Sequence, residues 1–107
     1  MYFLMLCTHD DGPGVAALRD SLRPAHRAWV ASGGEGLAVV LTGSALWDDA
    51  GNGTGNFGIL QCETEAAARA FAEGDPFHTG GVVRDIRLIR LADGFRAERI
   101  QPLSAAG

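Results

Sequence analysis

The chain opens with the apolar stretch YFLMLC (Tyr2–Cys7), and a cluster of turn-forming residues from Asp10 to Pro13 ends it. Successive side chains of a β-strand point to opposite faces of its sheet, so an unbroken apolar run predicts a strand that is buried on both faces. We therefore expect a sheet that carries helices on one face and needs an apolar partner on the other.

Three further strands are expected along the chain. Apolar and β-branched runs predict them at Leu37–Leu46, Gly55–Glu63 and Val82–Leu91, with a short fifth strand at Phe95–Ile100. The segment Trp47–Thr54 is rich in Asp, Gly and Asn, which is typical of a mobile hairpin loop between two strands.

Two helices are expected between these strands. The first covers about Arg23–Ser32, because Pro24 suits a first helical turn and the pair Gly33–Gly34 ends the helical pattern. Residues Val15–Leu22 are able to add a helical turn before it. The second helix covers Thr64–Glu73, with Thr64 as its N-cap.

The resulting order β-α-β-β-α-β is that of the ferredoxin-like fold, an α+β architecture with a four-stranded antiparallel sheet and both helices on one face. We expect a single domain over residues 1–103 and a frayed tail over residues 104–107. Because no helix remains for the second face of the sheet, we expect two copies to pack these faces together as a homodimer.

Composition and charge disfavour several classes of function. The net charge is −4 and the nine basic residues are scattered, which argues against nucleic acid as a partner. All nine are arginine, so no lysine can form a Schiff base or act as a general base. The opening apolar run of six residues is too short for a signal peptide or a membrane span. Two cysteines without CxxC spacing, Cys7 and Cys62, indicate unpaired thiols and a cytoplasmic location.

His26 and Asp75 are predicted to converge although they lie far apart in the chain. In the ferredoxin-like order, the start of the first helix lies near the end of the second, and the second strand ends at the same edge of the sheet. This edge should therefore gather His26 and Asp75 with Thr42 and Ser44. The cysteines should fall at opposite edges.

A histidine beside a carboxylate can serve as a general base. Asp75 would hold one tautomer of His26 and stabilise the imidazolium once a proton is taken, and Pro76 would restrain the backbone of Asp75. If the first helix begins near Arg23, its positive end would favour the neutral imidazole. A structural histidine and a helix-capping aspartate are the alternative interpretation, which the residues alone leave open.

Other polar residues point to no second site. His9 and His78 are expected in solvated loops, and no i, i+4 histidine pair or HxH spacing indicates a metal. Gly51, Gly53 and Gly55 alternate between two strands and open no helix, so a flexible hairpin is favoured over a phosphate-binding loop.

Several short motifs together resemble the YCII-related family over about residues 1–91. They are the run Arg23-Pro24-Ala25-His26, the strand with Thr42-Gly43-Ser44, the alanine-rich second helix and the turn Asp75-Pro76-Phe77. The resemblance implies a dimeric α+β barrel with a His–Asp active site, carried here onto His26 and Asp75. The chain departs from the family in a longer loop around residues 52–55 and at His78.

The family includes an enzyme that removes chloride from a chlorinated hydroxyquinol, and its sister families include muconolactone isomerases. The resemblance therefore implies cofactor-independent proton transfer on a small organic acid, aromatic-derived acids included, by an enzyme of lyase or isomerase type. We expect His26 and Asp75 to be catalytic and Ser44, Thr42 and Arg23 to bind the substrate, with no metal and no cofactor. A non-catalytic small-molecule-binding or accessory protein with the same pocket is the alternative.

Overall fold

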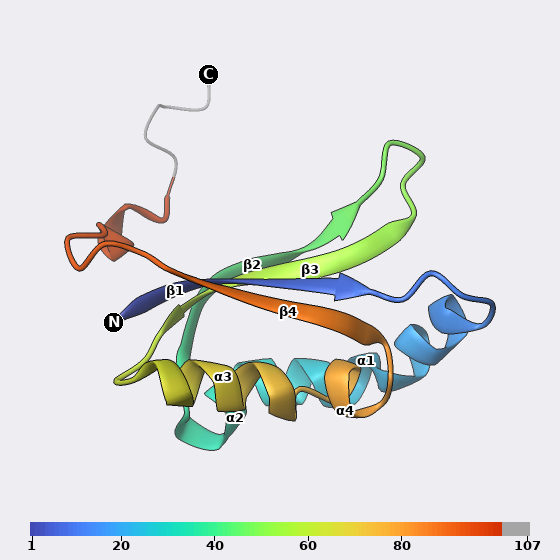
Figure 1. The fold of residues 1–107 in the computed structure, drawn as a ribbon, viewed down its shortest axis with the longest axis horizontal. Coiled ribbons are helices and arrows are strands. Elements are labelled where there is room, and N and C mark those ends of the chain that lie inside the picture. The colour runs from blue at the N-terminus through green and yellow to red at the C-terminus, as the bar shows by residue number, and fades with distance from the viewer. Residues whose placement is uncertain (102–107) are drawn as a thin grey trace.

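A computed structural model describes residues 1–101 as a four-stranded antiparallel sheet with helices on one face (Figure 1). The strands are β1 (Tyr2–His9), β2 (Val39–Trp47), β3 (Gly53–Gln61) and β4 (Val83–Arg90), in the sheet order β2-β3-β1-β4. The helices are α1 (Val15–Ala31), α2 (Gly33–Gly36), α3 (Glu65–Gly74) and α4 (Pro76–Thr79), followed by the 3-10 helix η1 (Ala97–Arg99). The predicted ferredoxin-like α+β fold is confirmed. The predicted frayed tail and the end of the predicted domain lie outside the described residues.

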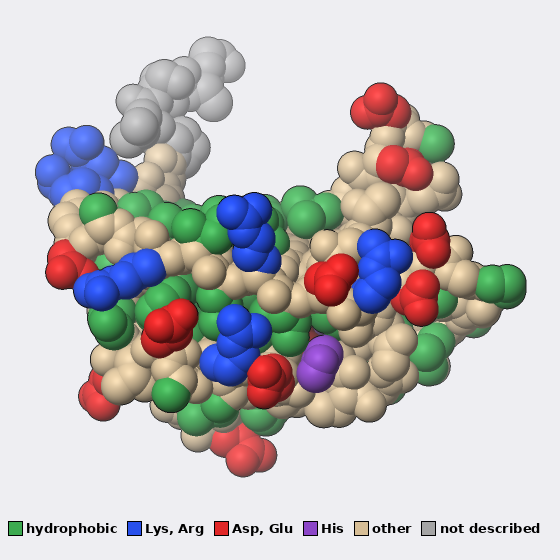
Figure 2. Space-filling model, in the orientation of Figure 1, with side chains coloured by type: hydrophobic (Ala, Val, Ile, Leu, Met, Phe, Trp, Pro, Cys, Tyr) green, Lys and Arg blue, Asp and Glu red, His purple; other side chains and the backbone are tan. Residues whose placement is uncertain are grey.

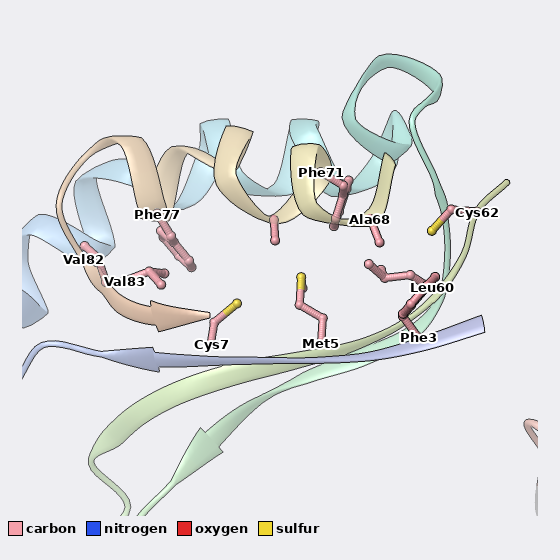
Figure 3. Close-up of a cluster of buried hydrophobic side chains, with 11 residues drawn as sticks. Phe3, Met5, Cys7, Leu60, Cys62, Ala68, Phe71, Phe77, Val82 and Val83 are labelled. Carbon is pink, nitrogen blue, oxygen red and sulfur yellow. The ribbon is translucent and has the colours of Figure 1, made fainter. Parts of the chain in front are cut away.

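Strand β1 divides its side chains between the two faces of the sheet, as its apolar run predicted. Phe3, Met5 and Cys7 are buried beneath the helices, where they meet Phe71 of α3 and Phe77 of α4 in the main core. Figure 3 shows this cluster between the sheet and the helices. Strand β1 lies between β3 and β4, so one short segment supplies apolar side chains to the core under the helices and to the helix-free face.

Helix α1 begins at Val15, so the prediction of a main helix starting near Arg23 is wrong. Pro24 lies inside the helix rather than in its first turn. A proline at this position removes the hydrogen bond to the carbonyl of Asp20 and crowds that carbonyl. Both Pro24 and Asp20 are exposed, so water can reach the carbonyl that the proline leaves free, and the helix continues through it.

Trp29 joins α1 to α3 through a hydrogen bond and close packing. Its indole Nε1 donates a hydrogen bond of 3.0 Å to the carbonyl of Phe71. The indole also lies against two glycines, because a Cβ built on Gly34 would come within 2.8 Å of Trp29 and one built on Gly74 within 2.6 Å. These two backbone positions must stay bare for the helices to approach, and this approach sets the distance between α1 and the end of α3.

The predicted fifth strand at Phe95–Ile100 is wrong, because this segment forms a turn and the helix η1. Its backbone N–H groups bond to nearby carbonyls, such as Phe95 to Ala92 and Ile100 to Ala97, instead of to a neighbouring strand. The ring of Phe95 packs edge-on against Tyr2 of β1 with centroids 5.3 Å apart. The segment therefore covers one end of the helix-free face.

The rest of the helix-free face has an apolar centre, with Arg87, Thr8 and Asp85 on the same face toward the other end of β1. The register of the strands places five side chains together on it, all partly exposed: Leu4, Leu6, Phe57, Ile59 and Ile89. The β2–β3 hairpin and the segment after β4 both rise on this side of the sheet (Figure 1), and Figure 2 shows hydrophobic side chains along the hollow between them.

The packing of Trp29 on Gly34 yields a prediction about stability. Gly34→Ala should lower the free energy of unfolding by about 1–3 kcal/mol more than Gly36→Ala, measured by urea denaturation, because overpacking a tight contact costs that much. Both glycines have positive φ angles, 63° and 94°, but a Cβ on Gly36 would meet nothing within 4 Å. Gly36→Ala thus controls for backbone strain, and equal losses in the two variants would contradict the packing argument.

Candidate active site

A cavity of about 580 Å³ lies between α1 and the β2–β3–β1 part of the sheet. Its floor is formed by the strands, and the ends of α3 and α4 close one side through Phe71, Asp75 and Phe77. From α1 the lining residues are Arg19, Arg23, His26, Arg27 and Val30. Both residues of the predicted His–Asp pair therefore line one cavity, as does Arg23.

His26 and Asp75 are joined by a hydrogen bond inside this cavity. His26 Nδ1 lies 2.8 Å from Asp75 Oδ1 and 2.9 Å from Oδ2. The side chain of His26 is 18% exposed and that of Asp75 only 5%. The predicted convergence of the two residues is confirmed, whereas their catalytic role stays a prediction.

Asp75 reaches this position because it is the single residue that connects α3 to α4. It follows Gly74, the last residue of α3, and its Oδ1 accepts a hydrogen bond of 2.9 Å from the backbone N–H of Phe77 in α4. The carboxylate thus caps α4 and binds His26 at the same time. The capping role considered from the sequence and the pairing with His26 are both present.

The contact with Asp75 fixes the tautomer of His26. A carboxylate only accepts hydrogen bonds, so Nδ1 must carry the proton that it donates. The opposite ring nitrogen, Nε2, makes no hydrogen bond with any group in residues 1–101 and is left to act as an acceptor. The ring of Phe77 stacks on the imidazole at 3.9 Å and 8°, which holds its plane. Such an imidazole can take a proton from a molecule in the cavity.

The helix dipole plays no part in this arrangement, contrary to the sequence-based expectation. His26 is the twelfth of the 17 residues of α1, because the helix begins at Val15. The field of a helix end falls off within its first turn. Asp75 and Phe77 are therefore the neighbours that define the environment of His26.

His9 is buried rather than in a solvated loop, so its prediction is wrong. It is the last residue of β1 and is only 5% exposed. Arg19 Nε donates a hydrogen bond of 3.1 Å to His9 Nδ1, and His9 Nε2 donates one of 2.7 Å to Asn56 Oδ1. An arginine can only donate, so His9 is neutral, with its proton on Nε2. The signal was available in the sequence, since His9 continues the alternation Phe3, Met5, Cys7 of the buried face.

Burial lowers the pKa of His9, and the positive charge of Arg19 and the proximity of His26 lower it further. Asn56 as an acceptor and the more distant carboxylate of Asp75 act in the opposite direction without cancelling the effect of burial. His78, the other histidine expected in a loop, lies in α4, where its Nδ1 bonds to the carbonyl of Glu73 at 2.8 Å.

Thr42 and Ser44 border the cavity, but strand register turns their side chains away from it. Ser44 pairs with Phe57 and Thr42 with Ile59, and these partners lie on the helix-free face. The Ser44 hydroxyl donates to the carbonyl of Ala45. A register shift between Val40 and Thr42 decides which side chains face the helices, and no sequence pattern revealed it.

The two cysteines are free and buried. Burial raises the pKa of the Cys7 thiol to about 12, so a nucleophilic thiolate is disfavoured there. Within residues 1–101, no three His, Cys, Asp or Glu side chains are grouped as metal ligands would be. No helix in the same range is long and apolar enough to cross a membrane.

The model of the YCII-related domain matches residues 1–92. The chain belongs to the YCII-related family. The fold is also similar to that of 5-chloro-2-hydroxyhydroquinone dehydrochlorinase from Burkholderia phenoliruptrix AC1100, solved in complex with 2,5-dihydroxybenzoquinone. The two share 25% sequence identity with a TM-score of 0.70, over 88% of this chain and 96% of the dehydrochlorinase. No curated protein matches the chain.

The lowered pKa of His9 predicts how stability depends on pH. As the pH falls through the ordinary histidine pKa of about 6.5, the unfolded chain takes up a proton at His9 before the folded chain does. The melting temperature should therefore fall between pH 7.5 and 5, and scanning calorimetry should find a smaller fall in His9→Gln. His78→Gln, which removes a partly exposed histidine, is the control and should keep the wild-type fall. An unchanged pH dependence in His9→Gln would contradict the assignment.

Proposed function

We propose that this protein is a cofactor-independent enzyme of lyase or isomerase type, with His26 as general base and Asp75 as its partner. The observation that carries the proposal is the hydrogen bond from His26 Nδ1 to Asp75, which leaves Nε2 as an acceptor on a ring that lines the cavity. The similarity to a dehydrochlorinase supports a reaction on a small molecule within this family.

In the first step, Nε2 of His26 removes a proton from a carbon or hydroxyl of the substrate, and the electron pair of that bond moves into an adjacent carbonyl or π-system. The imidazolium that forms is stabilised by the Asp75 carboxylate, which already accepts its Nδ1 proton. In an isomerase, His26 returns the proton to another atom of the substrate. In a lyase, the electron pair expels a leaving group, and the proton passes to solvent.

The substrate is a small organic acid, and an acid that contains an aromatic-derived ring is favoured. A volume of about 580 Å³ is within the range of small-molecule sites, and Phe71 and Phe77 offer flat apolar surfaces to a ring. Arg23 lines the same cavity, with its guanidinium 3.1 Å from Asp20. The Thr42 and Ser44 hydroxyls face the other side of the sheet, so within one protomer β2 can contact the substrate through its backbone and through side chains on the helix-covered face, such as Val40.

A small-molecule-binding or accessory protein without turnover is the second candidate. It is favoured by the cap that Asp75 provides to α4 and by the stack of His26 on Phe77, because both contacts also serve the fold. The two candidates share the cavity and differ only in whether His26 moves a proton.

Substitution of the pair separates the candidates. His26→Gln should reduce turnover by about 10²–10⁴-fold, the usual loss when a general base is removed, with little change in melting temperature. Asp75→Asn should also reduce turnover, because the amide no longer stabilises the imidazolium. The first assay is chloride release from 5-chloro-2-hydroxyhydroquinone, and the second is solvent deuterium exchange into a panel of small aromatic and unsaturated acids.

His78→Gln is the control, since it removes a histidine outside the cavity lining and should leave turnover unchanged. If His26→Gln keeps wild-type turnover, the base assignment fails. If the wild type binds members of the panel without turning any over, the binding protein is the correct function.

We also propose that two copies pair through their helix-free faces to form the dimeric α+β barrel. The apolar hollow centred on Leu4 is flanked by Ile59 and Ile89, and the projecting hairpin would embrace the partner sheet. An obligate interface of this kind should bury more than about 1,000 Å² in total. Such a pairing would also place the Thr42 and Ser44 side chains at the interface.

The pairing predicts the effect of a charge on this face. Leu4→Arg should convert a dimer into a monomer in light scattering coupled to size-exclusion chromatography, because a buried unpaired charge is costly. Ala66→Arg on the exposed side of α3 is the control and should remain a dimer. A wild-type monomer, or a Leu4→Arg variant that still dimerises, would refute the pairing.

A further inference from the structure

The cavity has a strong excess of positive charge, although the protein as a whole carries a net charge of −4. Arg19, Arg23 and Arg27 follow one another at i, i+4 and i+8 on α1, and all three line the cavity. This spacing places them along one face of a helix. Asp75 is the only carboxylate in the lining, and it is already bonded to His26.

Arg19 is the member of this series that the fold holds in place. Its Nε donates to His9 Nδ1 at 3.1 Å, and its Nη2 lies 3.4 Å from the carbonyl of Gly53 at the start of β3. His9 is in turn anchored by Asn56 at 2.7 Å. Within residues 1–101, Nη1 makes no hydrogen bond, and its two N–H groups are available to a ligand. By contrast, Arg23 is paired with Asp20, and Arg27 is exposed.

The position of Gly53 is explained by this guanidinium. A Cβ at residue 53 would lie 2.8 Å from Arg19 Nη1 and 3.3 Å from its Cζ. Gly53 has no positive φ angle, so its backbone does not itself require glycine. The bare position leaves room for the arginine between α1 and the hairpin.

The opposite end of the cavity is mainly apolar, although the exposed Arg27 also lines the cavity between His26 and Val30. Val30 of α1 lies there with Val40, Met5 and Phe71. At 1.5 Å of rise per residue, His26 is about 10 Å along the helix axis from Arg19 and about 6 Å from Val30. The cavity is therefore polarised, with a fixed cation at one end, an apolar wall at the other and the free nitrogen of His26 between them.

We propose that Arg19 determines specificity by binding the anionic group of the substrate, which orients the apolar remainder toward Val30 and the reacting atom toward His26. The ligand class is an amphipathic monoanion, either a carboxylate or the oxyanion of an acidic hydroxyl. This inference rests on the proposed function, because the orientation toward His26 matters only for catalysis. The preference for anions, however, is measured by binding alone. His9 is a positioning residue, which fixes Arg19 and does not touch the ligand.

A matched pair of probes isolates the charge from size and shape. The carboxylates 2-naphthoate and benzoate are compared with 2-naphthamide and benzamide by isothermal titration calorimetry on the full chain. The wild type should bind each carboxylate roughly 10-fold or more tightly than its amide, because a charge-assisted hydrogen bond contributes that much. A wild type that binds neither carboxylate, or that does not prefer it to the amide, overturns the inference.

Three variants locate the preference. Arg19→Gln should remove most of it while leaving amide affinity unchanged, and Arg19→Lys should retain a larger part because the charge remains. Gly53→Ala keeps the arginine but displaces its guanidinium, so it should weaken carboxylate binding even if Arg19→Gln is poorly folded. Arg84→Gln, at an exposed arginine outside the cavity lining, is the charge-matched control and should behave as the wild type.

The outcome is separable from that of the proposed function. His26→Gln should keep the carboxylate preference, since the selectivity belongs to Arg19, whereas turnover depends on His26. A preference that survives in both Arg19→Gln and Gly53→Ala shows that Arg19 is only a strut between α1 and the hairpin. If these variants lose the preference but the wild-type protein turns over no substrate, the inference about the anion site stands and the proposal of an enzyme is rejected.

Discussion

The site depends on one buried carboxylate, that of Asp75. A charge that is removed from water must be compensated by hydrogen bonds, and Asp75 receives them from the backbone of Phe77 and from the ring of His26. The first contact starts α4 directly after α3, and the second ties both helices to α1. Loss of the His26 N–H without a replacement donor would leave Asp75 Oδ2 unsatisfied, so the helical layer and the orientation of His26 are stabilised together.

The two histidines of the cavity are held by the same aromatic ring in different ways. His26 stacks on Phe77 at 3.9 Å, whereas His9 meets its edge with centroids 5.6 Å apart. His26 bonds to a carboxylate and keeps a free nitrogen, while His9 has both nitrogens occupied by Arg19 and Asn56. The fold thus separates a histidine that can exchange protons from one that supports a neighbouring cation.

The errors of the sequence-based prediction have local causes. Pro24 normally marks the start of a helix, but here the carbonyl that it frees can reach water, so α1 begins eight residues before Arg23, at Val15. Phe95–Ile100 has strand-like residues, yet its backbone bonds locally and Phe95 packs on Tyr2. In the first case solvent exposure, and in the second a contact with a residue distant in the sequence, outweighed the secondary-structure propensity of the segment.

The sequence by itself determined the order of elements and the doubly apolar β1, because periodicity and chain topology are sufficient for these. It also predicted the meeting of His26 with Asp75, but from a helix start at Arg23 that the structure moves to Val15. Tertiary structure alone decided that His9 serves Arg19 and that the Thr42 and Ser44 side chains leave the cavity. A single register shift in β2 reverses which face a side chain occupies, and such shifts depend on pairing with β3 rather than on β2 itself. The Arg19 network likewise requires α1, β1 and β3 to be in place before its partners are neighbours.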